Sequence, residues 1–196
     1  FSSLFILNRR IIKIYFAKWE YVFYHITLVF FLMFIMSFAG YKTLLKNKLV
    51  ITVLWVIPTI NILLAWTNDW TGWLWVGFVE SNFGNNTIIF EHGFAFLWVT
   101  ATGYMLLASI IAASWIAMRR SFGFARRQGQ VLFYGSLLPL IGNLIYLFQP
   151  PAFDGVDWSS IFISGSSVLF LWAFYGTNLI NVIPIAREKL MDRSGD

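Results

Sequence analysis

The chain has 196 residues, of which 59% are apolar and only 12% are charged, and its mean hydropathy is +0.71. Soluble domains carry about twice this share of charge, so the composition excludes a water-soluble domain. The net charge is +5, but the basic residues lie in short clusters between apolar runs, which is typical of membrane orientation signals and not of nucleic-acid binding. With no cysteine, disulfides, thiolate metal sites and Cys nucleophiles are excluded.

Residues 1–20 precede the first stretch that is long enough to cross a membrane. The opening FSSLFIL is apolar, but it is too short for a span, because a helix needs about 20 residues to cross the hydrocarbon. It lacks Met and places its apolar residues before its charges, unlike a signal peptide. We expect residues 1–20 to be an interfacial segment or the remnant of a preceding helix, in a native chain that extends further.

Five apolar runs of spanning length follow, and none contains Asp, Glu, Lys or Arg except at its ends. They predict an all-α fold, a polytopic bundle of transmembrane helices over residues 21–183, with a linker at 184–196. The expected spans are 21–40, 49–67, 93–118, 130–148 and 161–183.

The loops between these runs differ in charge. Most of the 14 basic residues lie in 41–48, 119–127 and the C-terminal tail, whereas 68–92 and 149–160 contain acidic residues and no Lys or Arg. The positive-inside rule predicts that the basic set is cytoplasmic. We therefore expect a multi-pass protein of the cell (inner) membrane with a cytoplasmic C-terminus. One cluster disagrees and falls on the outer side: Arg9, Arg10, Lys13 and Lys18.

Prolines interrupt two of the runs. Pro58 is followed three residues later by Asn61, and Pro139 is followed four residues later by Asn143. A proline inside a helix frees a backbone carbonyl, which needs a hydrogen-bond donor in lipid. We expect the two amides either to supply that donor or to bridge neighbouring helices.

Two histidines are the only candidates for cofactor binding. His25 lies near the outer end of the first run and His92 at the outer start of the third, so both could be axial ligands of a haem or chlorin. Hydrogen bonding at the interface is the alternative that we favour, and we predict no cofactor. We also find no metal-spaced cluster, phosphate loop or catalytic signature in the sequence, and we expect no catalytic site, no metal and no enzymatic activity within these residues.

The stretch TNDWTGWLW at 67–75 mixes indole rings with polar side chains at the outer end of the second run. An aromatic belt at the membrane interface is one explanation, and hydrogen bonding of the helix end by Thr67 and Asn68 is another. Polar groups beside apolar surface also favour a ligand pocket. The candidate pocket residues are Asn68, Asp69, Trp73, His92 and Trp98.

Four stretches, in order, resemble a known family: VIPTINILLAWTNDWTGWLW, EHGFAFLWVTATGYMLL, RRQGQVLFYGSLLPLIGNLIYL and the final run from DWSSIF to PIAREKLMD. The family is the N-terminal seven-helix sensor region of bacterial and archaeal histidine kinases. The resemblance covers about residues 17–196. One departure is that Thr71 or Gly72 stands where the family usually has His.

The resemblance implies a sensor of a two-component system, in which the five runs are helices three to seven. An unknown small molecule or membrane condition would act on the outer half of the bundle. Pro184 and Arg187 would pass motion of the last helix to a cytoplasmic output domain outside these residues. Such sensors are usually homodimers surrounded by membrane lipid.

Two other classes remain open. A non-catalytic accessory subunit of a larger membrane complex, with or without an associated pigment or haem, also suits a short aromatic-rich chain. A small transporter is less favoured, because no charge lies within a run to mark a substrate path and no inverted repeat is visible.

Overall fold

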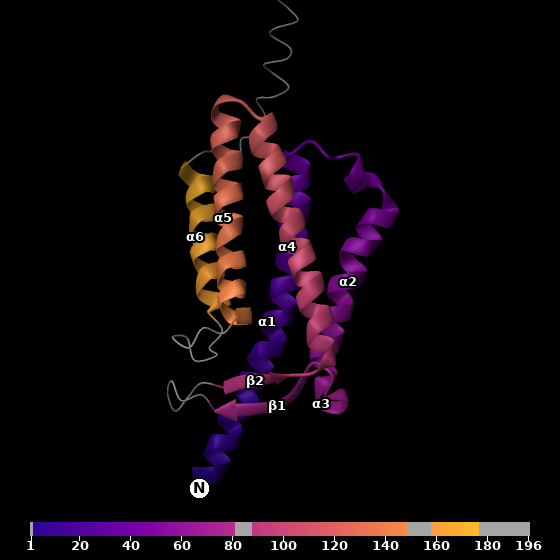
Figure 1. The fold of residues 1–196 in the computed structure, drawn as a ribbon, viewed down its shortest axis with the longest axis vertical. Coiled ribbons are helices and arrows are strands. Elements are labelled where there is room, and N and C mark those ends of the chain that lie inside the picture. Colours follow the sequence, from indigo (N-terminus) through magenta and orange to yellow (C-terminus); the bar gives the residue numbers. More distant parts are fainter. Residues whose placement is uncertain (1, 81–87, 149–157, 177–196) are drawn as a thin grey trace, which may run out of the picture.

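The computed structural model describes residues 2–80, 88–148 and 158–176, which form a mostly helical bundle with a β-hairpin at one end (Figure 1). The hairpin is the exception to the predicted all-α class. The elements in chain order are α1 (Ser2–Phe38), the 3₁₀ turn η1 (Leu44–Lys46), α2 (Lys48–Trp66), α3 (Asn68–Thr71), β1 (Trp75–Glu80), β2 (Ile88–His92), α4 (Phe94–Arg120), α5 (Gly123–Phe148) and α6 (Ser159–Gly176).

Among the described residues, three helices are long and apolar enough to cross a membrane: Ile11–Phe38 within α1, and the whole of α2 and α4. They overlap the first three predicted spans, but the first begins at Ile11 and not at residue 21. The fourth predicted span lies inside α5. The fifth lies partly in α6, which ends at Gly176, and residues 177–183 are outside the described part of the chain.

Helix α1 joins the predicted segment 1–20 to the first predicted span without a break. The charges at Lys13 and Lys18 suggested a boundary at residue 20, but Lys18 is compatible with a continuous helix because its ammonium is 2.6 Å from the Asp69 carboxylate. The partner of Lys18 is thus an acidic residue of α3, at the end of the bundle that carries the hairpin.

The hairpin is formed by β1 and β2, which pair antiparallel with Phe78 opposite Phe90. The hairpin therefore corrects the expectation that residues 68–92 form a loop. Its β-branched and aromatic residues suit a pleated, half-buried surface, and Phe90 packs its ring 4.9 Å from Trp75 and 5.3 Å from Phe78. The two basic loops 41–48 and 119–127 lie together at the opposite end of the bundle (Figure 1).

The core of the bundle lies between α1 and α4. Leu28, Leu32 and Ile35 repeat every three to four residues and so share one face of α1, which packs on a set from α4: Leu106, Ile110 and Ala113. Helix α5 contacts both α4 and α6. Helix α4 therefore contacts both the α1–α2 pair and the α5–α6 pair.

Helices α5 and α6 meet through glycines on α5. A Cβ at Gly135 would clash with the Phe170 ring, and one at Gly142 would lie 2.8 Å from Phe162 Cβ. The two glycines are seven residues apart, so they lie on the same face of α5. Small residues at this spacing allow close helix approach in membranes.

The proline in α5 shows which group satisfies a freed carbonyl. Pro139 cannot donate to the carbonyl of Gly135 four residues earlier, and the Ser166 hydroxyl of α6 donates to that oxygen at 2.8 Å. Asn143 instead donates to the Pro139 carbonyl at 2.8 Å. The freed carbonyl is therefore satisfied by a serine of the neighbouring helix, and the prediction for Asn143 is wrong because its amide bonds within its own helix.

Candidate functional site

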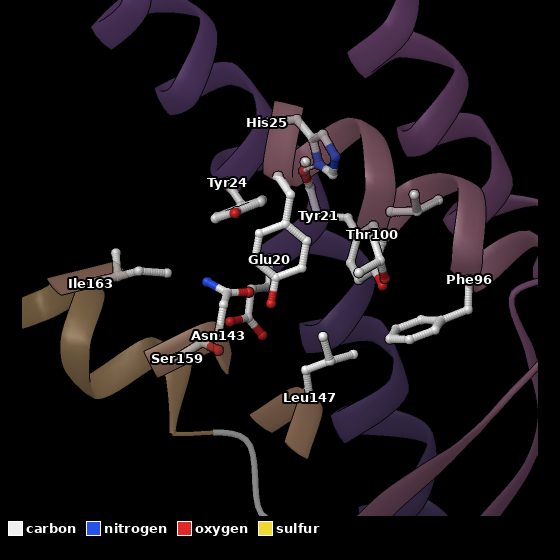
Figure 2. A pocket seen from close by; sticks show the side chains of 13 residues that line it. Glu20, Tyr21, Tyr24, His25, Phe96, Thr100, Asn143, Leu147, Ser159 and Ile163 are labelled. Carbon is white, nitrogen blue, oxygen red and sulfur yellow. Dashed lines mark hydrogen bonds between the residues drawn. The ribbon is translucent and has the colours of Figure 1, made fainter. Parts of the chain in front are cut away.

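A cavity of about 130 Å³ lies between α1, α4, α5 and α6 in the half of the bundle nearer the hairpin (Figure 2). It combines polar groups with apolar walls, which is the mixture that ligand sites use. Its polar lining comprises Glu20, Tyr21, Tyr24, His25, Thr100, Tyr104, Asn143 and Ser159, and its apolar lining includes Phe96, Val99, Leu147 and Ile163.

The first turns of α6 form one wall of this cavity. Ser159 and Ile163 line it, and the Ser160 hydroxyl donates to Glu20 Oε1 of α1 at 2.8 Å. On the opposite wall, a Cβ at Gly103 would meet no atom within 4 Å. The cavity is therefore bounded by a helix that contacts α1 through a polar side chain, and it has free space beside α4.

A buried hydrogen-bonded cluster joins α1, α2 and α4 beside the cavity. His25 Nδ1 lies 2.8 Å from the Tyr21 carbonyl, which can only accept, so Nδ1 carries the proton. His25 Nε2 then accepts from Asn61 Nδ2 at 3.0 Å, and Asn61 Nδ2 also donates to Thr102 Oγ1 at 2.9 Å. Asn61 thus bridges helices, which is one of the two roles expected from the sequence.

The rings of both histidines already contact other residues of the protein. The two ring nitrogens of His25 hold hydrogen bonds to Tyr21 and Asn61, so ligation of a haem by Nε2 would require the loss of the Asn61 bond. His92 stacks on Phe96 with ring centroids 3.5 Å apart and an interplanar angle of 2°. Within the described ranges, no group of three or more His, Asp or Glu could hold a metal ion.

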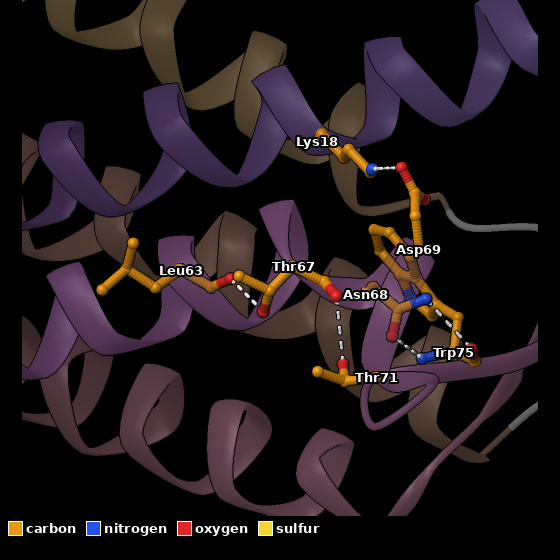
Figure 3. Close-up of polar contacts among 7 residues, drawn as sticks. All are labelled: Lys18, Leu63, Thr67, Asn68, Asp69, Thr71 and Trp75. Atoms are coloured by element: carbon orange, nitrogen blue, oxygen red, sulfur yellow. Dashed lines mark hydrogen bonds and ion pairs between the residues drawn. The ribbon is translucent and has the colours of Figure 1, made fainter.

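Asn68 shapes the turn that leads from α2 into the hairpin (Figure 3). Its Oδ1 accepts from the backbone amides of Leu74 at 2.8 Å and Trp75 at 2.9 Å, and its Nδ2 donates to the Trp75 carbonyl at 3.0 Å. Gly72 permits the turn because its φ of +61° lies in the left-handed region. The amide of Asn68 is therefore a structural bridge across its own loop.

The other predicted pocket residues lie near Asn68 or on the surface. Asp69 forms its ion pair with Lys18, Trp73 and Trp98 are about half exposed, and His92 packs on Phe96. None of the five predicted residues lines the cavity, whose lining includes His25. The signal that sequence analysis missed was the set of polar residues on α1, where Glu20, Tyr21 and Tyr24 lie at spacings of one to four. Pro184 and Arg187 lie outside the described residues.

The Lys18–Asp69 ion pair should respond unequally to the removal of its two partners. The Lys18 side chain is 2% exposed and that of Asp69 is 54% exposed. Asp69→Asn leaves a buried ammonium without its counter-charge and should lower the free energy of unfolding by about 3 kcal/mol. Lys18→Met leaves the carboxylate in contact with water and should cost at most about 1 kcal/mol. Thermal unfolding of the two variants in detergent tests this order, and equal losses would contradict it.

A family model described as the N-terminal 7TM region of histidine kinase matches residues 4–184. Comparison with curated proteins and with solved structures finds no match.

Proposed function

The chain belongs to the family of N-terminal 7TM regions of histidine kinases, and on that premise we propose that it senses a signal in the membrane and passes it through its last helix to a cytoplasmic output domain. This region is itself non-catalytic. The kinase activity of the proposed two-component system would reside in the output domain.

The proposal includes five membrane-crossing helices, which are α1, α2, α4, α5 and α6. It also includes a cytoplasmic C-terminus in the inner membrane. Two facts support this arrangement. The basic loops 41–48 and 119–127 share the end opposite the hairpin, and the positive-inside rule assigns such loops to the cytoplasm.

The cavity is the observation that carries the proposed signal site. It is lined by Ser159 and Ile163, and these residues belong to α6, the last described helix. A ligand in the cavity would therefore contact the helix that leads toward the output domain. We place the site here and not around Asn68 and Asp69, because the polar groups of those two residues already bond to the protein.

Signalling would then follow from differential affinity. A ligand that binds one packing of α6 against α1 and α5 more tightly than another shifts the populations of the two packings. Residues 184–187, with Pro184 and Arg187, would carry the resulting displacement to the output domain. A tenfold shift in the population ratio requires about 1.4 kcal/mol of differential binding.

Filling the cavity provides the first test. Gly103→Leu places a side chain beside the cavity where Gly103 has open space, and we expect it to change the basal autophosphorylation rate of the native full-length protein in proteoliposomes by roughly tenfold. Ala101→Leu adds the same side chain at an exposed position of α4 and should leave the rate unchanged. Equal rates in both variants and wild type would remove the cavity from the proposal.

The output domain is tested on the native polypeptide. Intact mass and sequencing beyond both ends should reveal a cytoplasmic kinase or related signalling domain after the last helix. A native chain that ends near Asp196 would contradict signal transmission within one polypeptide and would favour the accessory-subunit alternative.

A further inference from the structure

An apolar groove runs along the surface where α4 and α5 lie side by side. It has a volume of about 520 Å³, and small side chains on α4, Ala108 and Ala112, make it hollow. Larger side chains form its sides: Tyr104, Ile111 and Trp115 of α4, and Phe133 and Leu140 of α5.

Positive charge lies at the end of this groove that is farther from the hairpin. A second depression of about 520 Å³ there is lined by Gly123, Arg126, Arg127 and Gln130. The segment 119–127 contains four arginines and no acidic residue.

Two observations connect the charged depression with the apolar groove. Arg126, Gln130 and Phe133 are spaced by four and three residues, so they follow one stripe along α5, and this stripe passes from the depression into the groove. On α4, the Arg119 guanidinium lies 4.5 Å from the centre of the Trp115 ring, in a cation–π geometry. The apolar groove therefore ends near arginine side chains, one of which, Arg119, is held against Trp115.

The groove has the length of one membrane leaflet. From Tyr104 to Trp115 α4 rises about 16 Å at 1.5 Å per residue, and half of a bilayer's hydrocarbon is about 15 Å thick. An acyl chain in the groove would thus begin at the arginines and end near the bilayer midplane.

From charge, shape and length together, we infer that this groove binds one anionic phospholipid. Its phosphate lies at Arg126 and Arg127, with Arg119 beside it, and one acyl chain lies along Ala108 and Ala112. Guanidinium groups bind phosphate oxygens in a bidentate geometry, and basic pockets between transmembrane helices hold anionic head groups. A soluble phosphate would use the arginines alone and leave the apolar groove unexplained. This site adjoins the proposed signal cavity at Tyr104, which lines both, but the lipid proposal does not depend on ligand binding in that cavity.

The test uses the full chain purified in detergent with an equimolar mixture of phosphatidylglycerol and phosphatidylcholine carrying the same acyl chains. Native mass spectrometry should show a single retained phosphatidylglycerol in preference to phosphatidylcholine. Equal retention of the two lipids by the wild-type protein would overturn the proposal without any variant.

Two pairs of matched variants locate the site. Arg126→Gln with Arg127→Gln should lower the preference roughly 30-fold, whereas Lys46→Gln with Lys48→Gln removes the same charge from exposed positions at the same end of the bundle and should leave the preference intact. Ala108→Phe fills the groove and should abolish retention, whereas Ala101→Phe, at another exposed alanine of α4, should not. An equal loss in the lysine pair would show a diffuse charge effect and overturn the proposal. Displacement of the lipid by inorganic phosphate would also overturn it, in favour of a free-anion site.

Discussion

Asn68→Ala should lower the free energy of unfolding by about 2–6 kcal/mol. The substitution removes the acceptor of two buried backbone amides, those of Leu74 and Trp75, and each unsatisfied buried donor costs about 1–3 kcal/mol. It also removes the donor to the Trp75 carbonyl. Thermal unfolding in detergent, followed by circular dichroism, measures the loss.

Thr71→Ala is the matched control within the same turn. The Thr71 hydroxyl donates to the Thr67 carbonyl at 3.2 Å and accepts from the Trp73 amide at 3.4 Å, and because the latter contact is exposed, its removal leaves no buried amide unsatisfied. We expect a cost of about 0.5 kcal/mol. If Asn68→Ala costs no more than Thr71→Ala, Asn68 is not the bridge that holds the loop.

Gly93→Ala is the second substitution with a large expected effect, a loss of about 3 kcal/mol. Gly93 lies where β2 leads into α4, and its amide donates to the Leu74 carbonyl at 2.8 Å. An added Cβ would overlap the carbonyl oxygen of Trp73. Because that oxygen belongs to the backbone and accepts from the Ala95 amide at 3.0 Å, it cannot move without breaking the junction.

Two other glycines serve as comparisons for this prediction, because an added Cβ would meet different surroundings at each of them. Gly129→Ala would place its Cβ 2.8 Å from Met118 Cα where α5 crosses α4, whereas Gly103→Ala meets nothing within 4 Å. The loss of stability should decrease from Gly93 to Gly129, and Gly103→Ala should be neutral or stabilising by up to about 1 kcal/mol, because Ala favours the helix more than Gly does. The same unfolding measurement applies, and a large loss at Gly103 would show that backbone clashes do not set the order.

The helices are predictable from the sequence wherever an apolar run ends in a charge or a turn. The predicted spans 49–67, 93–118 and 130–148 coincide with α2, α4 and α5 to within a few residues at most of their ends. The hairpin was not predicted because each strand contains only a few residues that alternate between apolar and polar. These residues lie among glycines and asparagines, which are also typical of loops. Helix α1 was predicted as two segments because a charge inside an apolar run usually marks a boundary. The partner that allows Lys18 to lie within a continuous helix is 51 residues away in the sequence.

The cavity could not be predicted for a similar reason. Its lining comes from four helices, and the relative rotation of those helices depends on contacts such as Gly135 against Phe170, which no single segment encodes. The predicted site residues Asn68 and Asp69 were recognised as unusual polar groups. Their partners are a backbone turn and Lys18, and these contacts depend on tertiary structure that spacing along the chain does not reveal.

The turn at residues 68–75, which the hydrogen bonds of Asn68 hold in place, also limits which helices of the bundle can move independently of one another. Asn68 accepts from the amide of Trp75, the first residue of β1. The amides of Gly93 and Ala95 donate to the carbonyls of Leu74 and Trp73, which lie just before that strand. An isolated two-stranded hairpin is marginally stable, but here the start of β1 and the end of β2 are each attached to the end of a helix. At this end α2 and α4 therefore form one rigid body, although they contact each other little along their lengths. Of the helices that line the cavity, α5 and α6 make none of these contacts, and at this end α6 is joined to α1 by the hydrogen bond of Ser160 to Glu20 instead.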